Sequence, residues 1–113
     1  MSKHFVLVAG NIGAGKTYRF EIRDDGTLAN KTLFCEMGSD GMTLDNEGHL
    51  YLTGDGVMVF DQAGRQIEHL QIPDEKWTAN VAFCGRDRQT LFVTASTGLY
   101  AIRMRVEGAN AAK

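Results

Sequence analysis

Short runs in which apolar and polar residues alternate cover most of the chain, and glycine or Asn/Asp turns separate them. Alternation with a period of two predicts β-strands that bury one face, and no window has the 3.6-residue period of an amphipathic helix. We therefore expect an all-β fold with almost no helix. The expected strands cover about 4–9, 18–23, 31–35, 41–45, 49–53, 56–61, 65–72, 79–84, 90–95 and 98–106.

Four short segments are predicted to reverse the chain, because each offers Gly, Asn or Asp where a tight turn needs a positive φ. They are Asp24–Gly26, Asn46–Gly48, Ala63–Gly64 and Asp87–Arg88. The residues from Glu107 onward are small and polar. We expect one folded segment over residues 1–108 and a frayed tail at 109–113.

The strand pattern repeats along the chain. Leu50–Thr53 (LYLT) recurs 41 positions later as Leu91–Thr94 (LFVT), and Gly56–Phe60 recurs at an offset of 42 as Gly98–Ile102. A repeat of about 40 residues that carries about four strands is typical of the blades of a β-propeller.

On this division residues 4–35 supply three strands, residues 41–72 a complete four-stranded blade, and residues 79–106 three more strands. The sequence thus predicts a partial β-propeller of two to three antiparallel four-stranded blades. Closed propellers need roughly four to eight blades, so we expect this chain to be too short to close a ring alone. Uncovered blade faces favour either a homo-oligomer or aggregation.

Charge and hydropathy exclude several classes of partner. The net charge is −2, and Lys and Arg are scattered singly, so no nucleic-acid partner is expected. The apolar run Phe5–Ala9 is too short for a signal-peptide core or a membrane span. We expect no membrane partner and a cytoplasmic location for the chain as given, although the parent protein could be exported.

The segment Gly10–Thr17 (GNIGAGKT) matches the phosphate-binding P-loop, which would make Lys16 a nucleotide ligand. That chemistry needs a helix directly after the lysine, because the helix N-terminus helps to hold the phosphates. The following residues, Tyr18–Arg23, alternate like a strand instead. A glycine-rich connection between two strands is the favoured interpretation, and nucleotide binding is kept as a lesser alternative.

Asp40 is the carboxylate most suited to carry chemistry. It lies in Gly38-Ser-Asp-Gly-Met42, at the start of the first strand of a blade. In a propeller the innermost strands line the central channel, so Asp40 would be accessible there, with Gly41 allowing a close approach. An ordinary Asp turn leading into a strand is the structural alternative.

The other reactive side chains are expected to have structural roles. Cys35 and Cys84 are far apart in the sequence and lack a metal-ligand partner, which favours two free, buried thiols over a disulfide. The remaining candidates are the strand histidines His4, His49 and His69, which have no mutual ligand spacing, and the turn acids Asp45, Asp55 and Asp61.

From His4 to about Gly108 the chain resembles the C-terminal part of the SMP-30/gluconolactonase/LRE-like propellers. The resemblance is collinear over nearly the whole chain. The matching stretches are Gly15–Ile22, Asp25–Leu28, Ser39–Thr53, Val57–Asp61, Thr78–Gly85, Thr90–Ser96 and Leu99–Ile102.

The resemblance implies a six-bladed propeller that hydrolyses sugar lactones with a bound divalent cation, commonly Ca²⁺. By position, Asp40 matches the family's Asp-Gly motif, whose carboxylate ligates the metal and serves as general base. The cation would polarise the lactone carbonyl, and Asp40 would activate the attacking water. The identity of the lactone stays open.

The same resemblance places the other metal ligands, a Glu and an Asn of an Asn-Gly motif, upstream of Met1. Asn11 and Asn80 do not lie in that motif and are not substitutes. Because Ca²⁺ prefers about six to eight oxygen ligands, Asp40 alone would bind it weakly. We expect little or no lactonase activity from the isolated chain, and a non-catalytic, self-associating blade fragment is the main alternative.

Overall fold

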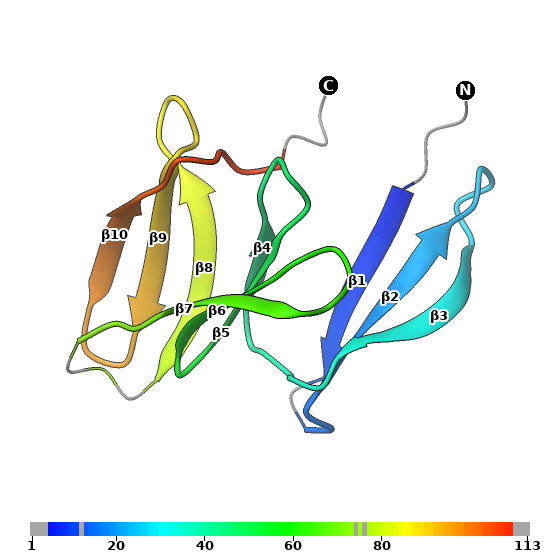
Figure 1. Cartoon of the computed structure of the whole chain (residues 1–113), viewed down its shortest axis with the longest axis horizontal. Coiled ribbons are helices and arrows are strands. Elements are labelled where there is room, and N and C mark those ends of the chain that lie inside the picture. The colour runs from blue at the N-terminus through cyan, green and yellow to red at the C-terminus, as the bar shows by residue number, and fades with distance from the viewer. Residues whose placement is uncertain (1–4, 12, 74, 76, 110–113) are drawn as a thin grey trace. The chain divides into compact units, whose positions relative to one another are not determined.

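The computed structural model describes residues 5–11, 13–73, 75 and 77–109, and all the elements in this part of the chain are β-strands (Figure 1). The all-β expectation is confirmed, and each predicted strand has a counterpart. The strands are β1 (Phe5–Asn11), β2 (Lys16–Ile22), β3 (Leu28–Cys35), β4 (Met42–Leu44), β5 (Leu50–Gly54), β6 (Gly56–Phe60), β7 (Gln66–Leu70), β8 (Thr78–Cys84), β9 (Thr90–Ala95) and β10 (Leu99–Arg103).

The strands form three antiparallel sheets in two compact units. The unit Met1–Ser39 holds the sheet β1-β2-β3. The unit Asp40–Lys113 holds the four-stranded sheet β4-β5-β6-β7 and the three-stranded sheet β8-β9-β10. This grouping of three, four and three strands confirms the division that the 40-residue repeat predicts.

Strand ends differ from the predicted ones where backbone groups find other partners. β2 begins at Lys16, ahead of the predicted 18, because Asn11 pairs with Lys16 and Gly10 with Thr17 across the glycine-rich turn. β10 ends at Arg103, because the next amide, that of Met104, donates a hydrogen bond to the carbonyl of Gln89.

The core of the second unit lies between its two sheets, where β8 packs against β4, β5 and β6. The rings of Tyr51 and Phe83 meet edge to face, with centroids 5.3 Å apart. All five residues of β5 are buried, so this strand forms the centre of the unit. The buried side chains of this core are Tyr51, Val57, Val59, Ile72, Val81, Leu91 and Val93.

Two buried threonines connect the sheets through hydrogen bonds. Thr78 Oγ1, at the start of β8, accepts a bond from the Gly54 amide (2.9 Å) and lies 2.5 Å from the carbonyl oxygen of Gly56, to which it donates. Thr53 Oγ1, in β5, accepts the amide of Gly41 (3.1 Å) and lies 3.4 Å from the carbonyl oxygen of Ala79 in β8. These contacts satisfy backbone groups at strand ends that would otherwise be buried without partners.

The end of the described chain is tied to the β4–β5 turn. The amide of Asn46 donates to the carbonyl of Glu107, and the amide of Ala109 donates to the carbonyl of Leu44. The amide of Gly108 donates to the carbonyl of Arg88. Residue 109, the first of the tail expected to fray, is therefore hydrogen-bonded, and residues 110–113 of that tail lie outside the described residues.

Candidate functional site around Asp40

Asp40 lies in the bend just before β4, and its side chain is exposed. The position agrees with the predicted one, at the start of the first strand of the four-stranded sheet. Because the Asp40 side chain is exposed, its carboxylate can hold a ligand at a defined place only if the backbone that carries it is fixed. The next residue, Gly41, supplies that support.

Gly41 is buried and held from two sides. Its amide donates to Thr53 Oγ1 (3.1 Å), and its carbonyl accepts from the Thr53 amide (3.2 Å). The hydroxyl proton of Thr53 can go to the carbonyl of Gly41 (3.2 Å) or to that of Ala79 (3.4 Å). Thr53 therefore connects the backbone next to Asp40 to the start of β8.

Gly41 also has no room for a side chain, because Asn80 of β8 lies against it. A Cβ at position 41 would stand 2.8 Å from Asn80 Cα and 3.0 Å from the carbonyl oxygen of Ala79. Ordinary carbon contacts are about 3.5–4.0 Å, so glycine is required for this approach. The starts of β4 and β8 thus meet directly beside Asp40.

The described residues do not by themselves complete a cation site. No group of three or more His, Cys, Asp or Glu side chains gathers in this part of the chain. A carboxylate oxygen suits Ca²⁺, but one carboxylate falls far short of the about six to eight oxygens that this ion takes. That Asp40 alone is an incomplete site stays a prediction.

The P-loop alternative fails its structural requirement. Lys16 and Thr17 begin β2, which runs antiparallel to β1, and no helix follows them. Thr17 is buried, and its hydroxyl donates to the carbonyl of Met37 (2.6 Å) instead of being available to a metal–phosphate complex. Ile12, within the motif, lies outside the described residues.

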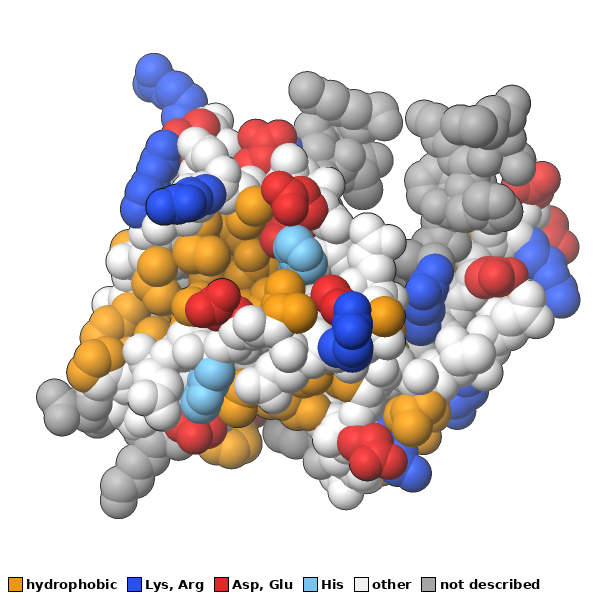
Figure 2. Space-filling model, viewed as in Figure 1, with side chains coloured by type: hydrophobic (Ala, Val, Ile, Leu, Met, Phe, Trp, Pro, Cys, Tyr) orange, Lys and Arg blue, Asp and Glu red, His pale blue; other side chains and the backbone are white. Residues whose placement is uncertain are grey.

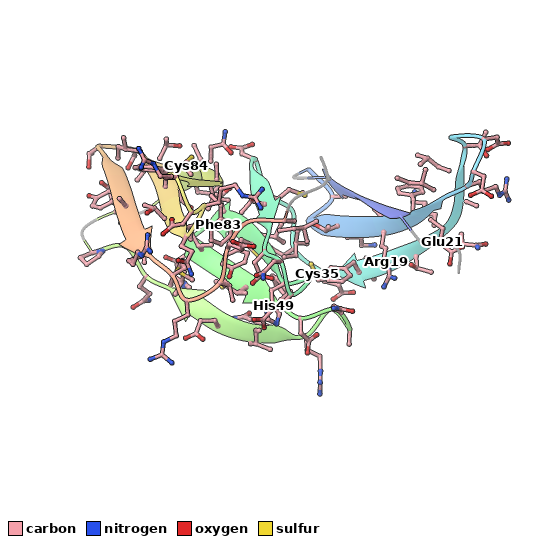
Figure 3. The ribbon with its side chains drawn as sticks, turned by 90° about the horizontal axis from the view of Figure 1, so that it is seen from above. Arg19, Glu21, Cys35, His49, Phe83 and Cys84 are labelled. Carbon is pink, nitrogen blue, oxygen red and sulfur yellow. The ribbon has the colours of Figure 1, made fainter. Side chains whose placement is uncertain are left out.

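A polar cluster surrounds Asp45. The sequence predicts only a turn residue at this position. Oδ1 of this buried carboxylate accepts the amides of Glu47 and His49, each at 2.9 Å. Oδ2 accepts the Tyr51 hydroxyl and His49 Nδ1, also at 2.9 Å each. His49 directly precedes β5, the strand that holds Tyr51, and its side chain is labelled in Figure 3.

The pKa values in the cluster follow from its burial and from its hydrogen bonds. Burial alone would raise the pKa of Asp45, but the bonds from His49, Tyr51 and Glu47 outweigh it and hold that pKa below its ordinary value. Burial, together with the bond to Asp45, raises the pKa of Tyr51. Asp45 is thus an ionised structural group. The spacing Asp-x-x-x-His-x-Tyr could have predicted this cluster, because strand alternation puts residues 49 and 51 on one face.

A hollow of about 320 Å³ lies beside this cluster, and its lining does not include Asp40. Figure 2 shows hydrophobic side chains gathered on this face of the unit. Val59, Ile67, Leu70, Met104 and Val106 form the apolar lining. The hollow is therefore separate from the candidate site.

Both cysteines are free thiols, as expected. Cys35 ends β3 and is buried, which raises the pKa of its thiol. Cys84 ends β8 and is only partly buried, so the expectation of burial is wrong for this residue (Figure 3). His49 is hydrogen-bonded to Asp45, and His69 to the carbonyl of Asp55, whereas His4 lies outside the described residues.

Comparisons with known proteins agree with the architecture. The profile of the SMP-30/gluconolactonase/LRE-like region matches residues 11–97. A 6-deoxy-6-sulfogluconolactonase from Pseudomonas putida is 31% identical over 88 residues, which cover 70% of this chain and 30% of that enzyme. Within the described residues, no helix has the length and apolar character needed to cross a membrane.

Three solved structures resemble the chain. A protein described as a gluconolactonase has a TM-score of 0.84 at 26% identity, and the match covers 93% of this chain and 37% of that one. A luciferin-regenerating enzyme has a TM-score of 0.78 at 18% identity, over 91% of this chain and 43% of the enzyme. The calcium-binding protein regucalcin from Agrobacterium tumefaciens has a TM-score of 0.75 at 22% identity, over 93% and 43%.

The chain therefore spans 30% of the curated relative and 37 to 43% of the three structures. The three sheets are those of part of a propeller, as the repeat predicts. From the profile match over residues 11–97 and the agreement of the fold, the chain belongs to the SMP-30/gluconolactonase/LRE-like family.

Proposed function

We propose that this chain is the part of a sugar-lactone hydrolase that supplies the acidic residue of the catalytic site, Asp40. The observation that carries the proposal is the fixed backbone behind this exposed carboxylate, where Gly41 is held by Thr53 and packed against Asn80. The relative from Pseudomonas putida, a lactonase by name, supports the substrate class.

In this proposal Asp40 has two roles. Its carboxylate is one ligand of a divalent cation, of which Ca²⁺ is the leading candidate because the regucalcin relative is a calcium-binding protein. It also accepts the proton of the water that attacks the lactone carbonyl, which opens the ring to the hydroxy acid. A bound cation would supply polarisation of that carbonyl. The described residues do not complete its ligand shell, so the chain alone should be a weak catalyst.

Lactone hydrolysis by the chain, with and without Ca²⁺, tests the proposal. With D-glucono-1,5-lactone we expect slow turnover above the buffer rate, and we expect Asp40→Ala to remove all of it. Asp40→Asn keeps an oxygen ligand but loses the base, so it should retain part of the cation binding and none of the turnover. Cation binding, followed by NMR shifts of the amides near Gly41, should weaken about tenfold in Asp40→Ala, as loss of one charged contact implies.

Asp55→Ala is the matched control, because Asp55 is also an exposed acid beside a strand of the same sheet. It should change neither turnover nor cation binding. Turnover that persists in Asp40→Ala would refute the assignment. Fast turnover by the unmodified chain would instead refute the expectation that one carboxylate is insufficient.

Self-association is the second candidate function, and the open edge of β10 favours it. β10 ends its sheet with a neighbour only on the β9 side among the described strands, and Leu99 on it is 65% exposed. Unpaired strand edges pair readily with other chains. Light scattering should show a dimer or larger oligomer, which Leu99→Arg shifts toward the monomer. A monomer at all concentrations would contradict this candidate.

A further inference from the structure

The geometry points to Asn80 as a second binding residue of the Asp40 site, one that donates a hydrogen bond to a hydroxyl or ring oxygen of a sugar lactone. This inference rests on the proposed function, because it supplies a substrate contact to the same site. It does not make Asn80 a metal ligand.

The first step is position. Gly41 can have no side chain because the Asn80 backbone lies against it, so Asn80 and Asp40 are neighbours at the starts of β8 and β4. Thr53 reinforces this arrangement, because its hydroxyl lies within hydrogen-bond distance of Gly41 and of Ala79, the residue before Asn80. Asp40 and Asn80 are both exposed, and the backbone contact between Gly41 and Asn80 connects the two segments that carry them.

The second step is the orientation of the carboxamide. Its Oδ1 accepts the backbone amide of Val81 at 2.9 Å. This bond uses the oxygen and leaves Nδ2 with no partner among the described residues, although it carries two protons. The bond orients the carboxamide, and the exposed Asn80 offers Nδ2 as a hydrogen-bond donor close to Gly41, the residue after Asp40.

The third step is chemical fit. A sugar lactone offers several hydroxyl oxygens and a ring oxygen, all of which accept hydrogen bonds. A carboxylate such as Asp40 can only accept, so on its own it cannot bind those lone pairs. Asn80 Nδ2 provides the missing donor polarity. Because the donor is fixed by the backbone before binding, little conformational freedom is lost when the ligand arrives.

Asn80→Asp is the decisive variant. It keeps the size of the side chain and the Oδ1 acceptor for Val81, removes the donor, and adds one negative charge. We expect KM for D-glucono-1,5-lactone to rise about five- to tenfold, the loss of one hydrogen bond, with kcat nearly unchanged. Ca²⁺ binding should not weaken, because the new carboxylate adds attraction for a cation. If Asn80 only supported the fold, the variant would weaken lactone binding and Ca²⁺ binding together.

Asn46→Asp is the matched control. Asn46 is exposed, and its Oδ1 likewise accepts a backbone amide, that of Glu107. The variant adds the same charge in the same way and should leave KM unchanged. In the ¹⁵N-labelled chain, the side-chain NH₂ signals of Asn80, identified by their absence in Asn80→Asp, should shift on addition of lactone with Ca²⁺.

The outcomes separate the two proposals. If KM is unchanged in Asn80→Asp and the NH₂ signals do not move, while Asp40→Ala still removes turnover, the inference on Asn80 is wrong and the proposed function stands. If the chain neither binds nor hydrolyses the lactone, both are wrong. A rise in KM restricted to Asn80→Asp, together with the NH₂ shift, establishes the contact.

Discussion

Replacing Asp45 with alanine is expected to lower the free energy of unfolding by about 3 kcal/mol, the largest effect of any single substitution considered for this chain. The reason is the number of donors that lose their acceptor. Two backbone amides, the Tyr51 hydroxyl and His49 Nδ1 all donate to this carboxylate, which is buried. Urea unfolding followed by circular dichroism measures the change.

Asp61→Ala is the control, because Asp61 accepts the amides of Ala63 and Arg65 in the same kind of turn but at the surface. Its loss should be clearly smaller, since water can replace the acceptor there. Equal losses at Asp45 and Asp61 would show that the buried bonds to His49 and Tyr51 contribute nothing. Tyr51→Phe should give a partial loss, because it removes only one of the donors.

The contribution of Asp45 also depends on pH. Its folded-state pKa lies below the ordinary value of 3.8, so the stabilisation is complete above that value and is lost as the pH falls through the lower folded-state pKa. The difference in stability between the unmodified chain and Asp45→Ala should therefore be constant near neutral pH and shrink in acid. A difference that grows in acid would contradict the assignment of an ionised Asp45.

Gly41→Ala is expected to lower the free energy of unfolding by about 2 kcal/mol, the middle of the range for overpacking a rigid site. The added methyl would stand 2.8 Å from Asn80 Cα and 3.0 Å from the Ala79 carbonyl oxygen, and backbone atoms cannot rotate away as a side chain can. The start of β4 must then separate from β8. Both the urea midpoint and the NMR signals of Asp40 and Asn80 should change.

Gly98→Ala is the matched control for this substitution. A methyl at position 98 would find its nearest atom, Tyr100 Cε1, at 3.4 Å, an ordinary contact, and Gly98 has no positive φ. The variant should unfold within about 0.5 kcal/mol of the unmodified chain, as surface substitutions usually do. If Gly41→Ala is equally neutral, the contact between the starts of β4 and β8 is looser than the structure shows.

Most of the fold could be predicted from the sequence, because a half-buried strand leaves a period of two and a tight turn leaves a glycine. Gly26, Gly48 and Gly64 all have positive φ in the segments predicted to turn. The prediction is wrong at the start of β2, where the glycine-rich motif overlaps the strand pattern. Lys16 and Thr17 were assigned to a glycine-rich connection, yet they pair with β1, because the turn is shorter than the motif.

The candidate site could be predicted only in part. Asp40 was singled out from its Asp-Gly setting, and the structure places it at the predicted strand start. The support by Thr53 and Asn80 is not predicted from the sequence. Thr53 reaches Gly41 through the pairing of β4 with β5, and Asn80, 39 positions away, reaches it through the packing of β8 on β4 and β5. Period and spacing report on local structure, whereas such contacts depend on tertiary packing.

The bonds between the β4–β5 turn and the last described residues have a consequence for synthesis. Asn46 and Glu107 exchange hydrogen bonds across 61 positions of sequence. While the ribosome is still making β8 to β10, the turn that follows the Asp40 strand therefore lacks those partners. Because the chain emerges N-terminal end first, this turn completes its hydrogen bonds only after residues 107–109 have left the ribosome.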